Sequence, residues 1–352
     1  MQGLQRTLAL LLAAVLAGCA TPRASLPDAP AITSPAPQTA ALVRRIDPQV
    51  MRGILAIDPD KVSDSDVRKL LAAGPTPRIV ALHGGIYPVH LVMESFARFL
   101  MGMGYPADKL RHPGDGRLSH SPYERSEQIA GLLAWYYESE GLMPMLVGHS
   151  QGGIQLVKVL YALDGKDTAQ LAVWNPLRDA AEPRTTIRDP FSGELRPVVG
   201  LKVPYASVVA AGGAALLLPN QWEMGGGRLQ RIPDSVQSFT GYSIGVDLVA
   251  WDLPGAGARY RPLGTAQVRN VELPSDYSHV LVAVTAHLAR DPVLRDWINA
   301  YEPGRANEPP QTQANTANLL WAADVWHDIK KQWALQAQRA LREQYHASAL
   351  PH

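Results

Sequence analysis

The chain has 352 residues, 46% of them hydrophobic, which is enough for one large domain or two modest ones with a sizeable buried core. Its 33 basic and 32 acidic side chains leave a formal net charge of +1, so no broad charge imbalance points to nucleic acid or an anionic membrane surface as a partner. The single cysteine, Cys19, excludes an intramolecular disulfide and any CxxC metal or redox site.

The first 18 residues are typical of an export signal. Arg6 precedes an apolar stretch, TLALLLAAVLA, that is too short to cross a bilayer, and LAGC (residues 16–19) closes it. LAGC resembles the lipobox of bacterial lipoproteins, whose cysteine becomes the lipidated first residue of the mature protein. The resemblance implies a lipid anchor at Cys19 and, with Ala20 next, the outer membrane facing the periplasm if the source is Gram-negative. An ordinary secretory signal is the alternative.

Residues 19–40 are rich in Pro, Ala, Ser and Thr, a composition that cannot build a core. We therefore predict an extended tether that lifts the following domain off the lipid. The folded domain is expected to span residues 41–309.

Strands alternate with helices along this domain. RIVALHGG (78–85) predicts a buried strand with a tight glycine loop, residues 121–141 a helix capped at Ser121, MPMLVGHS (143–150) a second strand, and GGIQLVKVLYALDG (152–165) the next helix. Further strands are expected at AQLAVWNP (169–176), SFTGYSIGVD (238–247) and AQVRNVEL (266–273), and a helix at HVLVAVTAHLARD (279–291). This alternation predicts an α/β fold with a mostly parallel central sheet and helices on both faces.

The pentapeptide GHSQG (residues 148–152) matches G-x-S-x-G, with an apolar strand before it and a helix after it. A serine at the tip of such a turn projects its hydroxyl outward, and the flanking glycines remove the Cβ atoms that would crowd it. With the additional Gly153 and the upstream HGG (83–85), the chain resembles the α/β-hydrolase superfamily, in particular its esterase and lipase branch, over residues 75–290. The resemblance implies the α/β-hydrolase fold and a nucleophilic Ser150.

A serine hydroxyl is a poor nucleophile at neutral pH, so Ser150 needs a base and a group that orients the base. In the fold that the chain resembles, the order is Ser, then Asp or Glu, then His. His279, after the last predicted strand, is the expected general base, and His287 is a less favoured candidate. Asp247 directly follows a predicted strand and is the expected acid, with Asp252 as the alternative.

The oxyanion of a tetrahedral intermediate needs two hydrogen-bond donors. The backbone N–H of Gln151, directly after the nucleophile, supplies the first. The second is expected from the loop HGGIYP (83–88), at Gly85 or Ile86, although Ile86 stands where HGGG-type loops have a third glycine.

Three segments have less specific patterns. Residues 177–235 occupy the place where many hydrolases insert a cap or lid, and their apolar YASVVAAGGAALLLP (205–219) is expected to line or cover an acyl pocket, or to form an extra buried helix. The polar loop 112–121 contains Asp115 and His120, which either contact substrate or belong to a turn-rich surface loop. Residues 310–352 predict an amphipathic C-terminal helix that packs on the domain, with a partner or membrane as the alternative contact.

No HExxH, P-loop or dinucleotide motif is present in the sequence, so no metal or cofactor is predicted. The features together predict a lipid-anchored serine hydrolase of carboxylic esters; thioester cleavage and acyl transfer use the same machinery. The expected partners are a small-molecule or lipid ester and, through the anchor, the membrane. The alternative is a non-catalytic envelope binding or assembly protein on the same scaffold.

Overall fold

The computed structural model describes residues 46–86, 89–251, 260–305 and 307–349, and the side chains of the last helix up to residue 343. The predicted export signal, Cys19, the tether and the alternative acid Asp252 lie outside the described residues. No helix within these ranges is both long and apolar enough to span a membrane.

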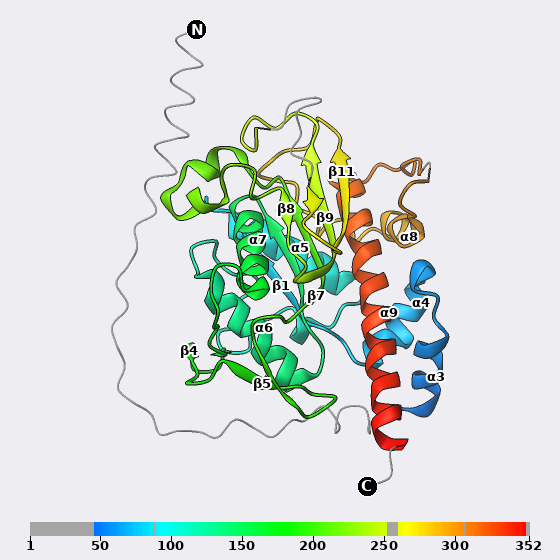
Figure 1. The fold of residues 1–352 in the computed structure, drawn as a ribbon. Helices are drawn as coiled ribbons and strands as arrows, with labels where there is room; N and C mark the ends of the chain where they lie inside the picture. The colour runs from blue at the N-terminus through cyan, green and yellow to red at the C-terminus, as the bar shows by residue number, and fades with distance from the viewer. Residues whose placement is uncertain (1–45, 87–88, 252–259, 306, 350–352) are drawn as a thin grey trace.

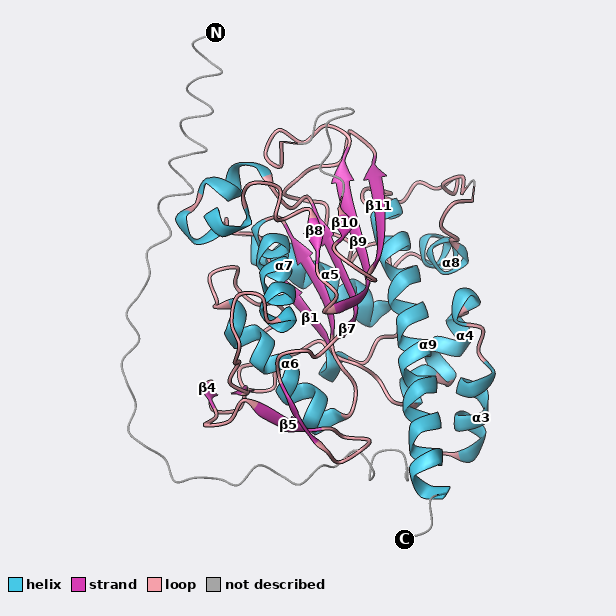
Figure 2. Ribbon diagram, in the orientation of Figure 1, coloured by secondary structure: helices cyan, strands magenta, loops and turns pink. Residues whose placement is uncertain are grey.

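A five-stranded parallel sheet forms the centre of the molecule (Figure 2). Neighbouring strands pair in parallel throughout, and the register aligns Leu82 with Gly148 and Val209 with Tyr242. The strands, in their order across the sheet, are β1 (Ile79–Leu82), β2 (Met145–His149), β7 (Val203–Val209), β9 (Val236–Ile244) and β11 (Gln267–Leu273). The first three are buried along their whole length, as expected for parallel strands covered on both faces.

Helices cover both faces of this sheet (Figure 1). Successive strand residues point to opposite faces, so Ile79 and Ala81 join one apolar core while Val80 and Leu82 join the other. The core on the second face contains the helices α6 (Ser126–Glu140) and α7 (Gln151–Asp164). The core on the first face contains α3 (Pro48–Ala56), α4 (Asp64–Lys69), α5 (Val89–Gly102), α8 (Pro292–Ala300) and α9 (Leu319–Ala349).

The C-terminal helix α9 is part of the main core. Trp321, Trp326 and Trp333 are completely buried and belong to the same apolar cluster as strand residues of the sheet. In Figure 1 the red α9 runs beside the blue α3 and α4, so the two ends of the described chain close one face together. The described part of the C-terminal helix therefore packs on the domain.

The remaining elements are short. The 3-10 helices are η1 (Pro59–Lys61), η2 (Leu71–Ala73), η3 (Ala107–Lys109), η4 (Gly213–Leu217) and η5 (Pro219–Met224). Three two-stranded pairs lie outside the central sheet: β3 (Trp174–Asn175) with β4 (Ala180–Ala181), β5 (Thr186–Arg188) with β6 (Leu195–Pro197), and β8 (Arg231–Ile232) with β10 (Arg261–Pro262).

The expected cap insertion at 177–235 is wrong in one part, because residues 203–209 form β7 at the middle of the sheet. This strand pairs with β2 on one side and β9 on the other, and every one of its side chains is buried. The first part of the apolar run, residues 205–209, therefore supplies core packing, while residues 210–219 follow the strand and include the 3-10 helix Gly213–Leu217.

The helix expected at 279–291 is also absent, and turns occupy residues 279–290 before α8 begins at Pro292. The amides of Thr285 and Ala286 both donate to Ser95 Oγ at 3.1 Å, so they are not available for helical bonds. The Asn318 side chain donates to two carbonyls of the same segment, at 2.8 and 3.1 Å. Side chains of two other elements thus satisfy the backbone in place of a helix.

Two further expectations need correction. Of the strand expected at 169–176 only β3 forms, and it pairs antiparallel with β4 outside the central sheet, because backbone bonds tie Val173 to Glu182 and Arg184. Helix α6 begins at Ser126 and not at a Ser121 cap. The Glu124 carboxylate accepts the Ser121 amide at 3.1 Å and holds that stretch as a turn.

Candidate active site

Ser150 lies at a sharp bend between the end of β2 and the start of α7. Its backbone has φ 54° and ψ −125°, a strained conformation for a residue with a side chain, and its amide donates to the Val209 carbonyl at 2.9 Å. A Cβ at Gly148 would lie 2.7 Å from the Gly153 Cα, and one at Gly152 would lie 2.4 Å from two carbonyl oxygens of the β1 end. The glycines therefore allow the backbones to approach closely enough to form the bend.

A continuous chain of hydrogen bonds joins Ser150 to two residues far along the sequence. Ser150 Oγ lies 2.8 Å from His279 Nε2, and His279 Nδ1 lies 2.6 Å from Asp247 Oδ2. Because Asp247 can only accept when ionised, Nδ1 carries the hydrogen and Nε2 is left to accept the serine proton. The structure thus brings together the three residues that the sequence predicted as nucleophile, base and acid.

Asp247 is buried and fixed in place by its own loop. Its Oδ1 accepts the amides of Val249 and Ala250 at 2.9 and 3.0 Å. Burial alone would raise the pKa of Asp247, but the hydrogen bond and charge of His279 and the two amides outweigh it, so the pKa is lowered from its usual value. The carboxylate is therefore ionised at neutral pH and can stabilise an imidazolium.

The other downstream histidines are not part of this chain of bonds. His287 lies among the turns before α8, where burial lowers its pKa and its Nε2 has no hydrogen-bond partner among the described residues. His327 lies on α9, where burial also lowers its pKa. Neither is hydrogen bonded to Ser150 or Asp247.

The glycine loop after β1 packs directly against the bend. A Cβ at Gly84 would lie 3.2 Å from Ser150 Cβ, and one at Gly85 would overlap the Gln151 side chain at 1.7 Å. Tyr123 Oη donates to the Gly85 carbonyl at 3.2 Å. Gln151 is the first residue of α7, where an amide has no helical acceptor, so its N–H is available beside Ser150. Whether Gly85 or Ile86 supplies a second donor stays a prediction.

His149 is also part of this site. Because it precedes Ser150, the expected order of Ser, then Asp or Glu, then His excludes it as the general base. Its side chain is 0% exposed, and its Nε2–H donates to the main-chain carbonyl of His279 at 2.7 Å. Burial, reinforced by the His279 charge, lowers the pKa of His149 to about 4, so the ring is neutral at pH 7. No signal in the local sequence indicates this contact.

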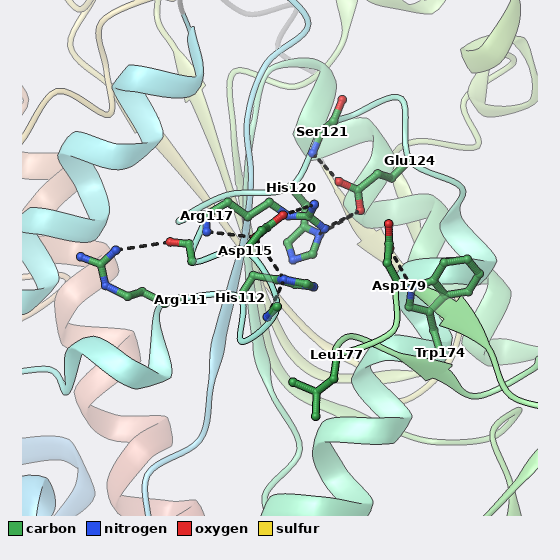
Figure 3. Close-up of polar contacts among 12 residues, drawn as sticks. Arg111, His112, Asp115, Arg117, His120, Ser121, Glu124, Trp174, Leu177 and Asp179 are labelled. Carbon is green, nitrogen blue, oxygen red and sulfur yellow. Dashed lines mark hydrogen bonds and ion pairs between the residues drawn. The ribbon is translucent and has the colours of Figure 1, made fainter. Parts of the chain in front are cut away.

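A polar cluster holds the loop 111–124 beside β1 (Figure 3). The His120 amide donates to the Ala81 carbonyl at 2.7 Å, and His120 Nδ1 lies 2.9 Å from Glu124 Oε2. Asp115 is paired with Arg117 at 2.9 Å. Asp115 and His120 are thus both engaged by residues of their own loop, and His120 is buried, so this is a turn-rich loop tied to the core.

Glu124 is expected to contribute strongly to stability. Burial alone would raise its pKa, but His120, Arg117 and the Ser121 amide lower it from 4.5 to about 2. A carboxylate with a depressed folded-state pKa stabilises fully above its unfolded pKa and loses that contribution as the pH falls through the folded value. We expect Glu124→Gln to lower the free energy of unfolding at pH 7 by about 2 to 3 kcal/mol.

Urea denaturation at several pH values measures this effect. The difference between wild type and Glu124→Gln should shrink steadily as the pH falls from 4.5 to 3. Glu127→Gln, an exposed neighbour at the start of α6, is the control and should change the unfolding free energy by less than about 0.5 kcal/mol. A wild-type advantage that stays constant down to pH 3 would contradict the assignment.

Parts of the loops at the carboxyl edge of the sheet are apolar and lack charged side chains. The stretches 83–86, 210–222 and 280–289, in the segments after β1, β7 and β11, contain no Asp, Glu, Lys or Arg, while Asp276 lies between β11 and the last of them. Large apolar side chains at least 36% exposed in the loops after the strands include Ile86, Leu217, Trp222, Leu248, Trp251 and Leu281. Because the carboxyl ends of parallel strands meet at one edge of a sheet, we expect these side chains on the side of the sheet that carries Ser150.

Comparison with known proteins adds little. No family model and no curated protein matches the chain. One similar solved structure is that of a protein of unknown function from Agrobacterium tumefaciens, provisionally described as an alpha/beta hydrolase. The sequence identity is 11%, the match covers 67% of this chain and 90% of that one, and the TM-score is 0.31. A likeness this distant carries no conclusion about function.

Proposed function

We propose that this protein is a serine hydrolase on an α/β-hydrolase scaffold, which cleaves carboxylic esters through an acyl-enzyme at Ser150. The observation that carries the proposal is the unbroken chain of hydrogen bonds from Ser150 Oγ through the His279 ring to the buried Asp247 carboxylate. The strained bend that holds the serine supports it, because such strain persists where the surrounding structure enforces it, often at reactive residues.

In the acylation half, Ser150 Oγ attacks the ester carbonyl carbon while its proton passes to His279 Nε2. The ionised Asp247 stabilises the imidazolium that results. When the tetrahedral intermediate collapses, His279 gives this proton to the leaving alkoxide oxygen, the carbon–oxygen bond of the ester breaks and the alcohol departs. The acyl group remains on Ser150.

In the deacylation half, His279 takes a proton from a water molecule, whose oxygen attacks the acyl carbon. Collapse of the second intermediate breaks the bond to Ser150 Oγ, which recovers the proton from His279, and the carboxylic acid is released. An alcohol or thiol in place of water would give acyl transfer by the same steps. The amides of Gln151 and of Gly85 or Ile86 are proposed to bind the oxyanion, each worth about 3 kcal/mol in the transition state.

The proposed substrates are uncharged esters with apolar acyl groups. The loops around Ser150 are poor in charge and expose large apolar side chains, which suits an acyl chain better than a charged one. The lipobox-like sequence at Cys19 supports a lipid-anchored location in the bacterial envelope, at the outer membrane facing the periplasm if the source is Gram-negative.

The proposal is tested by reaction of the purified wild-type protein with a fluorophosphonate, which phosphonylates activated serines. We expect a stoichiometric mass increase that peptide mapping assigns to the peptide containing Ser150. A folded protein that stays unlabelled, or a label on another serine, would contradict the proposed mechanism.

The acyl-chain preference follows from the apolar loops. We expect kcat/KM for aryl esters to rise at least about tenfold from acetyl to octanoyl, because each CH₂ removed from water contributes up to about 0.8 kcal/mol. Leu248→Ser, at a side chain 75% exposed beside the acid, should flatten this rise, whereas Leu195→Ser, 68% exposed on β6, should not. A profile that falls with chain length would exclude the apolar loops from acyl binding.

The acid is tested with Asp247→Asn. Asparagine keeps the oxygen that accepts the amides of Val249 and Ala250 but has no charge to fix the His279 tautomer, so kcat should fall by about 10⁴-fold with little change in KM. Asp276→Asn, an exposed residue in the same loop as His279, is the matched control and should stay within about twofold. Steady-state hydrolysis of a short aryl ester measures both, and an active Asp247→Asn enzyme would move the role to another acid.

A further inference from the structure

The last residue of β2, His149, connects the serine bend to the loop that carries the base. Its ring is completely buried and its Nε2–H donates to the His279 carbonyl at 2.7 Å. The two imidazole rings lie 5.6 Å apart between centroids. This bond is separate from the bond between Ser150 and His279, so the base is held at its main chain as well as at its ring.

The loop of residues 274–281 has little regular structure to fix it. Apart from the bonds of the His279 ring to Ser150 and Asp247, its other hydrogen bonds are local turns or run to the start of α9, where Tyr277 Oη accepts the Leu320 amide at 3.1 Å and Asn318 donates to the Leu281 carbonyl at 2.8 Å. Among the bonds of the described residues, only that from His149 ties this loop's main chain to β2, the strand that ends directly before Ser150.

The opposite edge of the His149 ring faces the glycine loop. A Cβ at Gly84 would lie 3.5 Å from His149 Nδ1, and within the described chain Nδ1 has no hydrogen-bond partner. The ring thus fills the space between the loop after β1 and the loop after β11. With its hydrogen on Nε2, the ring donates to the His279 carbonyl, and only this ring orientation makes that bond.

We propose that His149 is a positioning residue for the proposed general base: it fixes the His279 main chain so that Nε2 stays within hydrogen-bond distance of Ser150 Oγ. The proposal rests on the proposed hydrolase function. A displacement of about 1 Å at a reacting group can cost about 100-fold in rate. Loss of the His149 hydrogen bond to this loop should therefore lower turnover measurably, although His149 does not contact substrate.

The test compares His149→Phe, which fills the space without a donor, with His149→Gln, whose amide N–H can reach the position of Nε2. For a short aryl ester we expect kcat to fall about 10- to 100-fold in His149→Phe with KM unchanged, and to stay within about threefold of wild type in His149→Gln. The control is Tyr161→Phe on α7, which removes a buried side-chain donor to backbone carbonyls away from the site and should leave kcat unchanged.

Proton NMR gives a readout that does not need activity. The His279 Nδ1 proton, held by Asp247, should give a far-downfield resonance that shifts or broadens in His149→Phe and is retained in His149→Gln. If His149→Phe does not fold, His149→Met replaces it as a donor-free variant of similar volume.

Wild-type kcat and an unchanged resonance in the donor-free variant would overturn the positioning role. So would an equal loss in both variants, because the role belongs to the donor. A wild-type protein that fails to react with esters and fluorophosphonate overturns the proposed function, and the resonance still decides whether His149 fixes His279.

Discussion

Replacing Ser150 with alanine is expected to abolish ester hydrolysis and fluorophosphonate labelling. The Oγ that forms the acyl bond is removed, and neither His279 nor Asp247 can substitute for it, so kcat should fall by about 10⁶-fold. Alanine and serine both carry a Cβ, so the backbone strain at the bend is the same for both residues. The substitution should therefore leave the fold intact. Residual hydrolysis, about 10³- to 10⁴-fold above the rate in water, would come from the oxyanion donors and substrate binding.

Labelling and steady-state kinetics, with circular dichroism to check folding, measure this result. The control is Ser139→Ala, since Ser139 Oγ donates to the Trp135 carbonyl within α6 and is not part of the site. It should react like wild type. Turnover that survives in Ser150→Ala would assign the chemistry to a different residue.

Replacing His279 with alanine should produce a loss of similar size. Without the ring, no group accepts the Ser150 proton at 2.8 Å, and in serine hydrolases the loss of the base costs about as much as the loss of the nucleophile, about 10⁶-fold in kcat. The fluorophosphonate reaction should stop for the same reason, because it needs the same proton transfer.

His287→Ala is the matched comparison, since His287 lies eight residues further along the chain and is not hydrogen bonded to Ser150. It should keep most of the labelling and turnover. Both variants are measured with the same short aryl ester and probe. Inactivity of His287→Ala beside an active His279→Ala would transfer the role of base.

The local part of the site could be predicted from the sequence because its constraints are local. A serine between glycines, with an apolar strand before it and a helix after it, has few ways to fold, and β2, Ser150 and α7 are consecutive in the chain. Asp247 could be chosen because it lies just after a strand, three residues beyond the last residue of β9. A carboxylate of the triad is expected in the loop at the end of a strand.

The remainder depends on contacts between distant residues. The segment 279–291 has an apolar pattern suited to a helix, but Ser95 and Asn318 take its backbone groups, and neither is near it in sequence. The His149 bond to His279 spans 130 residues. Knowing the order of the triad residues removes His149 as a base but gives no information about its contacts.

Three helices that the sequence analysis does not predict have strong capping signals. Asp47 before Pro48, Ser63 with Asp66, and Asp291 before Pro292 are start signals for α3, α4 and α8. In contrast, β7 contains Pro204, which argues locally against a central strand, and its residues show no alternation, because a strand buried on both faces needs none.

The positive φ at Ser150 lowers the stability of the fold at the same residue that carries the hydroxyl of the proposed mechanism. Glycine would occupy this backbone conformation without the penalty that any side chain incurs there, so a mutation to glycine should make the folded chain more robust while leaving it chemically inert. The serine at the tightest point of the bend is therefore less favourable for folding than glycine would be, and the proposed function gives the reason for its hydroxyl.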